Sequence, residues 1–320
     1  MKHVMIGASL LALSATAAST ASAEENLWVY AKGTDTRPKG STELKLSSIS
    51  RLGKGKGNGS YAFHDIRPQI EYGVTDRLTI GAELIIFNHN YSITNPDLNP
   101  MFETQDGTGS YNNTSIGGYE LALKYNVLSP YKDAIGLSFV AAWDHRDKYR
   151  LDGADIKQNS VELMALLQKN FMDDTLVFAF NPKIEFERRH SDDGVDFVLE
   201  EEISLDISAG VSYRVAPKWF VGLEFRHQSD YLSPEVNGVY EEPSLKPSHF
   251  DLKKFQIGTQ HQNGNYFGPT VHYARENWWA TAGILFQFSG GGSEFAFKQN
   301  GKNFDEHEKV HIGWTLGYEF

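Results

Sequence analysis

The 320-residue sequence contains no cysteine and, beyond its first two dozen residues, no long apolar run. Without cysteine there is no disulfide scaffold, thiolate metal site, cysteine nucleophile or lipid-anchored N-terminal cysteine. Without an apolar run of about 18 residues there is no transmembrane helix. The net charge of −11 argues against nucleic acid as a partner. The 41 aromatic residues, 13% of the chain, are too many for a disordered polar protein.

The first 23 residues have the features of a secretory signal peptide. Lys2 precedes an apolar stretch from Val4 to Ala18, and Ala21-Ser22-Ala23 fits the A-x-A rule for cleavage. The apolar stretch is too short for a transmembrane helix. We therefore predict cleavage after Ala23 and export, followed by secretion or insertion into an outer membrane. A buried N-terminal helix is the alternative.

The rest of the chain alternates apolar residues with small or polar ones, and no apolar stripe of helical period persists beyond two turns. Between residues 78 and 86 every second position is Leu, Ile or Ala, and Thr79 and Glu83 stand between them. A period of two is the pattern of a β-strand. Twelve such segments follow one another along the chain, and the first, near residue 44, is the weakest.

The connections between these segments alternate in length. Those at 75–77 and 172–175 are short, whereas those at 92–114 and 231–264 are long and polar. Short turns at one end and long loops at the other are typical of an outer-membrane barrel. The alternative, a soluble β-sandwich, would bury many charges at a heavy desolvation cost. We therefore predict an all-β fold, a transmembrane antiparallel up-and-down β-barrel of about 12 strands with both termini in the periplasm. Residues 255–261 also alternate; they fit either a strand extension above the membrane or a thirteenth span, which would break the even strand count.

In a membrane barrel the apolar set of each strand faces lipid and the alternate set faces the lumen. The alternate set carries charges of both signs, which predicts a wet lumen with weak ion selectivity. The predicted lumen lining consists of Arg67, Glu71, Glu83, Glu120, Lys124, Lys183, Glu185, Arg214, Glu224 and Arg226.

The last eleven residues, 310–320, place aromatic or aliphatic residues at every second position and end in Phe320. This segment resembles the C-terminal strand of Gram-negative outer-membrane barrels. The resemblance implies that Trp314, Tyr318 and Phe320 form the signal recognised by the barrel-assembly machinery.

Three further segments carry a second resemblance: Trp28–Gly40, His64–Pro68 and Asp305–Lys309. Together they look like a family of bacterial outer-membrane barrel proteins of unassigned, porin-like function. The resemblance spans most of the mature chain. It implies a location in the outer membrane of a Gram-negative bacterium, with outer-membrane lipids and lipopolysaccharide as neighbours, and it implies no chemistry.

His307-Glu308-Lys309-Val310-His311 spells H-E-x-x-H, the signature of zinc proteases. That signature places both imidazoles on one ion only when it lies on a helix. On a strand, four residues span about 13 Å, too far for two imidazoles to share a metal. Because Val310 begins the last predicted strand, we predict no metal site here and no cofactor elsewhere.

His227-Gln228-Ser229 lies near the end of the ninth predicted strand, where residues two apart point the same way. Residues 227 and 229 lie on the same face of the strand as the apolar Phe225, which is the face predicted to contact lipid. The pair resembles the His-x-Ser pairs of outer-membrane phospholipases and lipid A deacylases. That resemblance implies Ser229 as nucleophile and His227 as base, with Glu241 or Glu242 as the acid of a triad. Asp230 departs from it, because such enzymes usually carry Asn there. A polar cuff above the membrane is the alternative.

These observations predict three parts: a signal peptide at 1–23, a periplasmic N-terminal segment at 24–40 and an outer-membrane barrel at 41–320. The leading functional hypothesis is a passive, porin-like channel for small polar solutes. One alternative is a lipid-facing acyl-ester hydrolase that uses Ser229 and His227. The other is a non-catalytic structural barrel whose long loops, such as 92–114, bind a partner at the cell surface.

Overall fold

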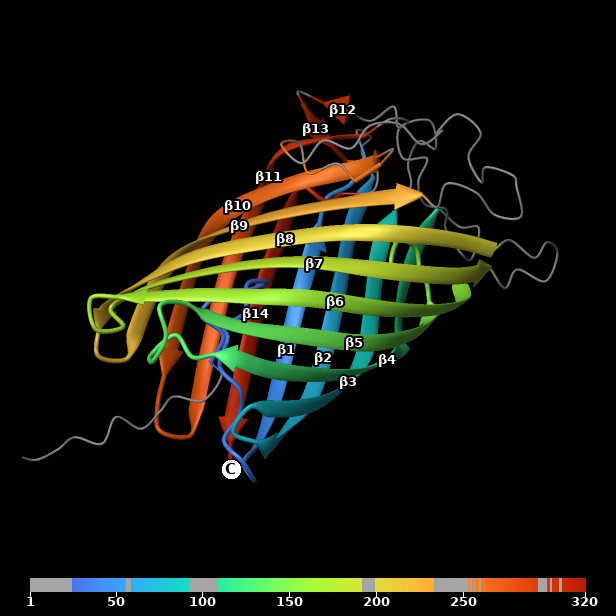
Figure 1. The fold of residues 1–320 in the computed structure, drawn as a ribbon. Helices are drawn as coiled ribbons and strands as arrows, with labels where there is room; N and C mark the ends of the chain where they lie inside the picture. Colours follow the sequence, from blue (N-terminus) through green and yellow to red (C-terminus); the bar gives the residue numbers. More distant parts are fainter. Residues whose placement is uncertain are drawn as a thin grey trace, which may run out of the picture.

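The computed structural model of the chain describes residues 25–55, 59–92, 109–191, 199–232, 253, 255, 257–258, 260–292, 298–299, 301–304 and 307–320. They form a closed barrel of twelve antiparallel strands, in which each strand pairs with its neighbours along the chain and β14 closes the wall between β11 and β1 (Figure 1). The prediction of an all-β barrel with about twelve strands is confirmed. No helix in these residues is long and apolar enough to cross a membrane.

The barrel strands have the following bounds: β1 Thr42–Leu52, β2 Ser60–Thr75, β3 Leu78–Ser92, β4 Ser110–Leu128, β5 Gly136–Lys148, β6 Asp155–Phe171, β7 Leu176–Ser191, β8 Leu199–Ala216, β9 Trp219–Leu232, β10 Gln260–Ala274, β11 Trp278–Gly292 and β14 Val310–Glu319. The residues of β12, Lys298–Gln299, and β13, Lys302–Asn303, pair as a separate two-stranded sheet.

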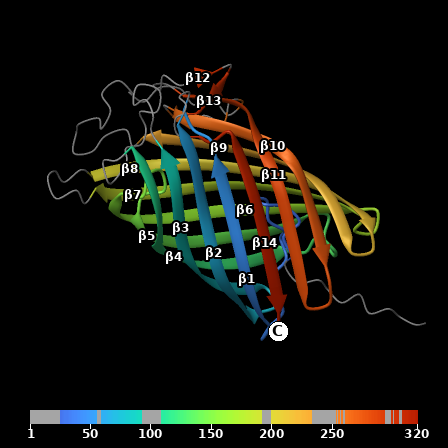
Figure 2. The same ribbon diagram turned by 180° about the vertical axis from the view of Figure 1, so that it is seen from behind.

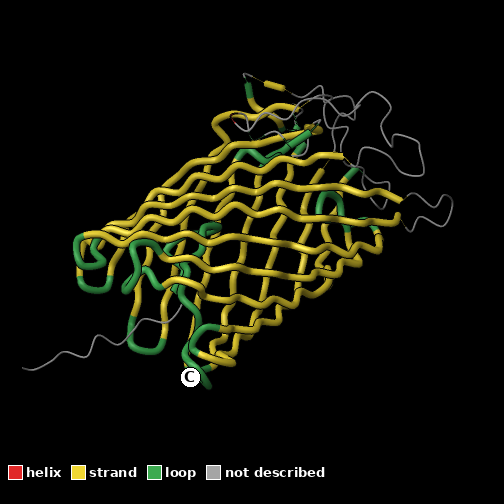
Figure 3. Tube along the Cα trace, in the orientation of Figure 1, coloured by secondary structure: helices red, strands yellow, loops and turns green. Residues whose placement is uncertain are grey.

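The two ends of the barrel differ. At one end, together with the start of β1 and the end of β14, the five connections from β2–β3 to β10–β11 span two to seven residues (Figures 1 and 2). At the other end the connections β3–β4, β9–β10 and β11–β14 are the longest of the barrel, while β1–β2, β5–β6 and β7–β8 have six or seven residues. We call the first of these the short-turn end, and the opposite one the loop end. The strands run tilted around the whole wall (Figure 3), as closure of a sheet into a barrel requires.

The two faces of the wall carry opposite chemistry. Leu121 and Leu223 point outward and are 49% and 44% exposed, whereas Lys124 and Glu224 point inward and are buried. The exposed apolar side chains need no protein core, because lipid is their solvent. The period of two in the sequence therefore sorts apolar residues to the lipid and charged residues to the lumen.

One side of the lumen is apolar, which the alternation did not predict. At the loop end of β2 and β3 the side chains of Tyr61, Phe63, Ile85, Phe87 and Tyr91 form a buried cluster with Leu151. The β5–β6 connection folds inward to reach it, since Tyr61 Oη donates a hydrogen bond to the Leu151 carbonyl at 3.0 Å. The lumen therefore combines a dry aromatic layer with the charged wall nearer the short-turn end.

Candidate functional site

Residues 25–37, here called the N-terminal segment, precede β1 and lie across the lumen at the short-turn end (blue in Figure 1). Glu224 of β9 is buried in the lumen wall and accepts three hydrogen bonds from the backbone of this segment. The donors are the N–H groups of Val29, Tyr30 and Ala31, at 3.0, 2.7 and 2.6 Å. A carboxylate that receives three amide donors is a strong anchor for a backbone.

Side-chain amides of the wall bind the next part of the segment. The backbone N–H of Lys32 donates to Asn181 Oδ1 at 2.6 Å, and Asn181 Nδ2 donates back to the Lys32 carbonyl at 3.1 Å. Thr34 repeats the arrangement, because its N–H donates to Gln168 Oε1 at 2.9 Å and its carbonyl accepts from Asn126 Nδ2 at 3.0 Å. Polar wall residues thus bind the backbone N–H and C=O groups of this irregular segment, which has no strand partner.

The apolar side chains of the segment lie against glycines of the wall. A Cβ atom on Gly210 would lie 2.4 Å from the Trp28 indole, and one on Gly313 would lie 2.2 Å from Cγ1 of Val29. Any side chain at either position would displace the segment. Trp28 itself is buried. The wall and the N-terminal segment are therefore complementary in shape as well as in hydrogen bonding, a feature that no local sequence signal had indicated.

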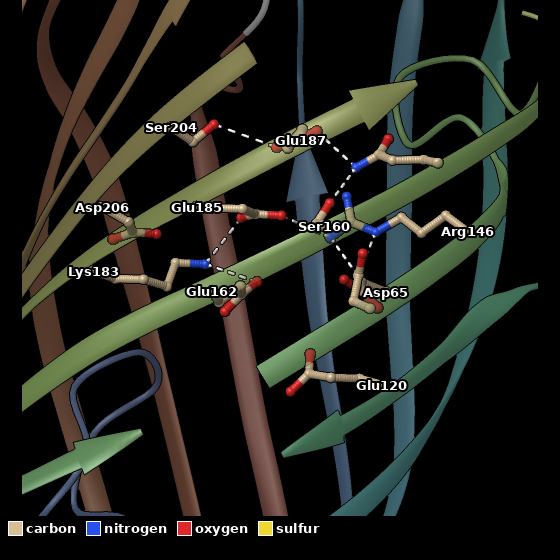
Figure 4. A network of polar contacts seen from close by, with 12 residues as sticks. Asp65, Glu120, Arg146, Ser160, Glu162, Lys183, Glu185, Glu187, Ser204 and Asp206 are labelled. Atoms are coloured by element: carbon tan, nitrogen blue, oxygen red, sulfur yellow. Dashed lines mark hydrogen bonds and ion pairs between the residues drawn. The ribbon is translucent and has the colours of Figure 1, made fainter. Parts of the chain in front are cut away.

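Above the segment the lumen wall carries a network of ion pairs (Figure 4). Arg67 binds Asp65 at 2.8 Å, Glu83 at 2.6 Å and Glu120 at 3.3 Å. Across the lumen Lys183 lies between two carboxylates, Glu162 at 3.1 Å and Glu185 at 3.3 Å (Figure 4). The pairs Arg67–Glu83 and Lys183–Glu162 join neighbouring strands, Arg67–Glu120 reaches from β2 to β4, and the other two lie within one strand. Together they compensate most of this buried charge.

A cavity of about 240 Å³ lies among these charges. At the roughly 30 Å³ that each water molecule occupies in the liquid, it has room for about eight water molecules. Nine lysines and arginines and eight carboxylates border it, so neither sign dominates. Of the ten residues predicted to line the lumen, these eight border the cavity: Arg67, Glu71, Glu83, Glu120, Lys124, Lys183, Glu185 and Arg226.

The other two predicted lumen residues lie elsewhere. Glu224 binds the N-terminal segment, as described above, and Arg214 lies over the Phe220 ring at 5.0 Å. Arg214 does not border the cavity. That the remaining eight form the path of a solute stays a prediction.

The H-E-x-x-H residues lie at the loop end, next to the start of β14. Glu308 pairs with Lys54 at 3.2 Å and accepts a hydrogen bond from His311 Nε2 at 3.0 Å. Burial alone raises the pKa of Glu308, but Lys54 and the His311 hydrogen bond outweigh it and hold that pKa well below its ordinary value. Burial also lowers the pKa of His307 well below its ordinary value. Within the described ranges no three His, Cys, Asp or Glu side chains are arranged to hold a metal ion.

The His-x-Ser pair lies on the outer side of the wall. His227 Nε2 is 2.9 Å from Ser229 Oγ, and His227 Nδ1 is 2.8 Å from Oδ1 of Asn265, which pairs with His227 across β9 and β10. Both members of the pair are buried, and the Phe255 ring lies 4.8 Å from the imidazole. The predicted acid, Glu241 or Glu242, lies outside the described residues, and the group next to the histidine is Asn265, 38 residues further along the chain.

At the C-terminus Trp314, Tyr318 and Phe320 point outward and are 41%, 47% and 69% exposed. Their side chains therefore lie on the lipid-facing surface. Their role as an assembly signal stays a prediction.

The closed twelve-stranded wall, its outward apolar band and its charged lumen define an outer-membrane β-barrel. The chain belongs to a family of unknown function, DUF6662, whose model matches residues 20–320. This confirms the predicted resemblance to an uncharacterised barrel family. No curated protein matches the chain significantly.

Two solved structures illustrate the fold. The COG4313 outer membrane channel from Pseudomonas putida F1 matches with a TM-score of 0.54 at 9% identity, over 90% of this chain and 98% of that one. The β domain of the Bordetella autotransporter BrkA matches with a TM-score of 0.52 at 10% identity, over 88% of this chain and 100% of that one. At such low identity the likeness extends to the fold alone.

Proposed function

We propose that this outer-membrane barrel is a passive channel for small polar solutes, closed at its short-turn end by the N-terminal segment. The observation that carries the proposal is the cavity of about 240 Å³ in the lumen, bordered by charges of both signs. A dry, fully packed interior would need no such lining, because buried charge is costly unless it is paired or hydrated.

The segment is suited to act as a closure. It is held by side chains of the wall, such as Glu224 and Asn181, and is not a strand of the barrel. Its departure would leave every interstrand hydrogen bond of the wall intact, and the polar groups it leaves behind would become hydrated. The segment therefore can leave without unfolding the barrel.

At the loop end we expect the polar route to follow β1 and β14 rather than β2 and β3, where the aromatic cluster lies. Arg51 borders the cavity, and the buried pair of Lys54 and Glu308 lies next to the start of β14. We expect solutes to pass on this side. Because the lining carries nearly equal numbers of cations and carboxylates, we expect weak selectivity between anions and cations.

Single-channel recording in planar bilayers tests the proposal. We would compare the mature protein with a variant that lacks residues 25–37, each checked for folding by its shifted mobility in unheated gel samples. We expect rare openings for the mature protein, persistent conductance for the variant, and a reversal potential near zero in a salt gradient. Silence from both folded proteins contradicts a channel, and a strong preference for one ion sign contradicts the role of the mixed lining.

A further inference from the structure

The outer faces of β9 and β10 hold a chain of three polar side chains, His227 and Ser229 of β9 and Asn265 of β10, that the lumen does not use. His227 and Ser229 share the outer face of β9 with Val221 and Leu223, which are 45% and 44% exposed to the surroundings of the barrel. Ser229 lies three residues before the end of β9 at the loop end. This is the level at which a barrel strand leaves the hydrocarbon and meets lipid headgroups.

The hydrogen bonds give each of the three a distinct role. The amide oxygen of Asn265 can only accept, so the ring proton of His227 lies on Nδ1, at 2.8 Å. The other ring nitrogen, Nε2, then accepts the hydroxyl proton of Ser229 at 2.9 Å. A nucleophile within hydrogen-bond reach of a base, which is itself oriented by a third group, is the arrangement that activates serine for acyl transfer.

We propose that Ser229, His227 and Asn265 form a second site, on the lipid-facing side of the wall, that hydrolyses the acyl esters of membrane lipids. Ser229 is the nucleophile and His227 the general base. Asn265 is a positioning residue that holds the imidazole in the required tautomer. The substrate is a carboxylic ester of a long-chain acyl group, which glycerophospholipids and lipopolysaccharide both contain.

The reaction needs only water as a second reactant. Ser229 Oγ attacks the ester carbonyl carbon while its proton moves to Nε2 of His227. The tetrahedral intermediate then breaks the bond to the alkoxide oxygen, which takes that proton and leaves as an alcohol. Water, deprotonated by His227, attacks the acyl-serine, and collapse releases the fatty acid and returns the proton to Ser229.

Tyr231 completes the site. In the conformation described its hydroxyl accepts hydrogen bonds from Ser229 Oγ at 3.3 Å and from Gln260 Nε2 at 3.1 Å, so the Ser229 hydroxyl proton is shared between Tyr231 and the nearer His227 Nε2. The Tyr231 hydroxyl itself donates to the Phe255 carbonyl. Once released from that carbonyl it can donate to the oxyanion that forms beside Ser229.

Phe255 covers the site in this conformation. Its ring lies 4.8 Å from that of His227, and its φ of 57° is left-handed, which is unfavourable for a bulky aromatic residue. The acyl chain of a lipid would take the place of this ring. The site is therefore closed until Phe255 moves aside.

The barrel contains a matched control. Ser50 Oγ lies 2.7 Å from His64 Nδ1, in positions of β1 and β2 that also face outward. Among the described residues no side chain holds the second nitrogen of His64. The proposal therefore requires Ser229 to react with a fluorophosphonate and Ser50 not to react.

The experiment uses the folded mature protein in detergent micelles and in vesicles. Fluorophosphonate labelling is located by mass spectrometry, and fatty-acid release is measured separately from phospholipid vesicles and from lipopolysaccharide. We expect the adduct on Ser229 alone, loss of release in Ser229→Ala, unchanged release in Ser50→Ala, and several-fold faster labelling in Phe255→Ala. The lipid that supports Ser229-dependent release identifies the substrate.

The role of Asn265 has its own readout. Asn265→Ala should lower kcat by about 10²-fold. Asn265→Asp should keep activity but move the acidic limb of the pH profile upward by about one pH unit or more, because a carboxylate favours the protonated imidazole. A merely structural Asn265 would leave that limb in place. No Ser229 adduct in either the native protein or Phe255→Ala, together with no Ser229-dependent release from either lipid, would overturn the proposal.

Discussion

Replacing Glu224 by glutamine should release the N-terminal segment without disturbing the barrel. The carboxylate accepts three backbone hydrogen bonds, two at Oε1 from Tyr30 and Ala31 and one at Oε2 from Val29. A glutamine can keep the two bonds at one oxygen, but it loses the charge and places an amide donor against the Val29 N–H.

The magnitude follows from these three bonds. Hydrogen bonds to a charged group contribute about 1.5–3 kcal/mol each, against about 0.5–1.5 kcal/mol for neutral ones. Glu224→Gln therefore weakens docking of the segment by about 3 kcal/mol, which corresponds to about a 10²-fold larger detached population at 1.4 kcal/mol per factor of ten.

Single-channel open probability is the assay, with Glu162→Gln as the matched control. Glu162 is also a lumen carboxylate, but it pairs with Lys183 and not with the segment. We expect a strong rise in open probability for Glu224→Gln and little change for the control. If the open probability of folded Glu224→Gln equals that of the native protein, the segment is not the closure.

Three further predictions concern the glycines that face the N-terminal segment and the buried Glu308 at the loop end. Gly210→Ala should also raise open probability, because the new methyl group would lie 2.4 Å from an indole of the segment, whereas Gly291→Ala, whose methyl group has its nearest neighbour at 3.5 Å, should not. The double variant Val29→Cys with Gly313→Cys should close the channel under oxidation and reopen it under reduction, since the two Cβ positions are 3.2 Å apart, a few tenths of an ångström from disulfide spacing. Glu308→Gln should lower the free energy of unfolding by about 3 kcal/mol at pH 7 in urea titrations followed by tryptophan fluorescence. Because the folded pKa of Glu308 lies below the unfolded value of 4.5, that difference should be full above pH 4.5 and shrink as the pH falls below it.

Much of the architecture could be predicted from the sequence because strand period is a local property. The alternation along β3 or β9 determines which side chains share a face, and the lipid then selects the apolar face. The turn lengths separate the two ends of the barrel. The number of strands, the side of the wall that each side chain faces and the closed barrel could therefore be predicted without any knowledge of contacts between distant residues.

The sites could be predicted only in part. His227 and Ser229 are two residues apart, so their contact is a property of one strand. Asn265 joins them because β9 and β10 pair in one particular register, which is set by the wall as a whole. The sequence alone therefore offers only nearby acids such as Glu241 as the third group, and no local signal indicates Asn265.

Glu224 also combines a property that the sequence predicts with contacts that only the folded barrel creates. Its inward direction follows from its parity on β9, but its partners lie 193 to 195 residues earlier in the chain. Only closure of the barrel brings the backbone of the N-terminal segment across the lumen to that carboxylate. The sequence by itself determined a twelve-stranded outer-membrane barrel with a charged lumen, because period and turn length are local. The tertiary structure alone decided what occupies the lumen and which side chains meet on its outer wall, because those contacts depend on strand register and barrel circumference.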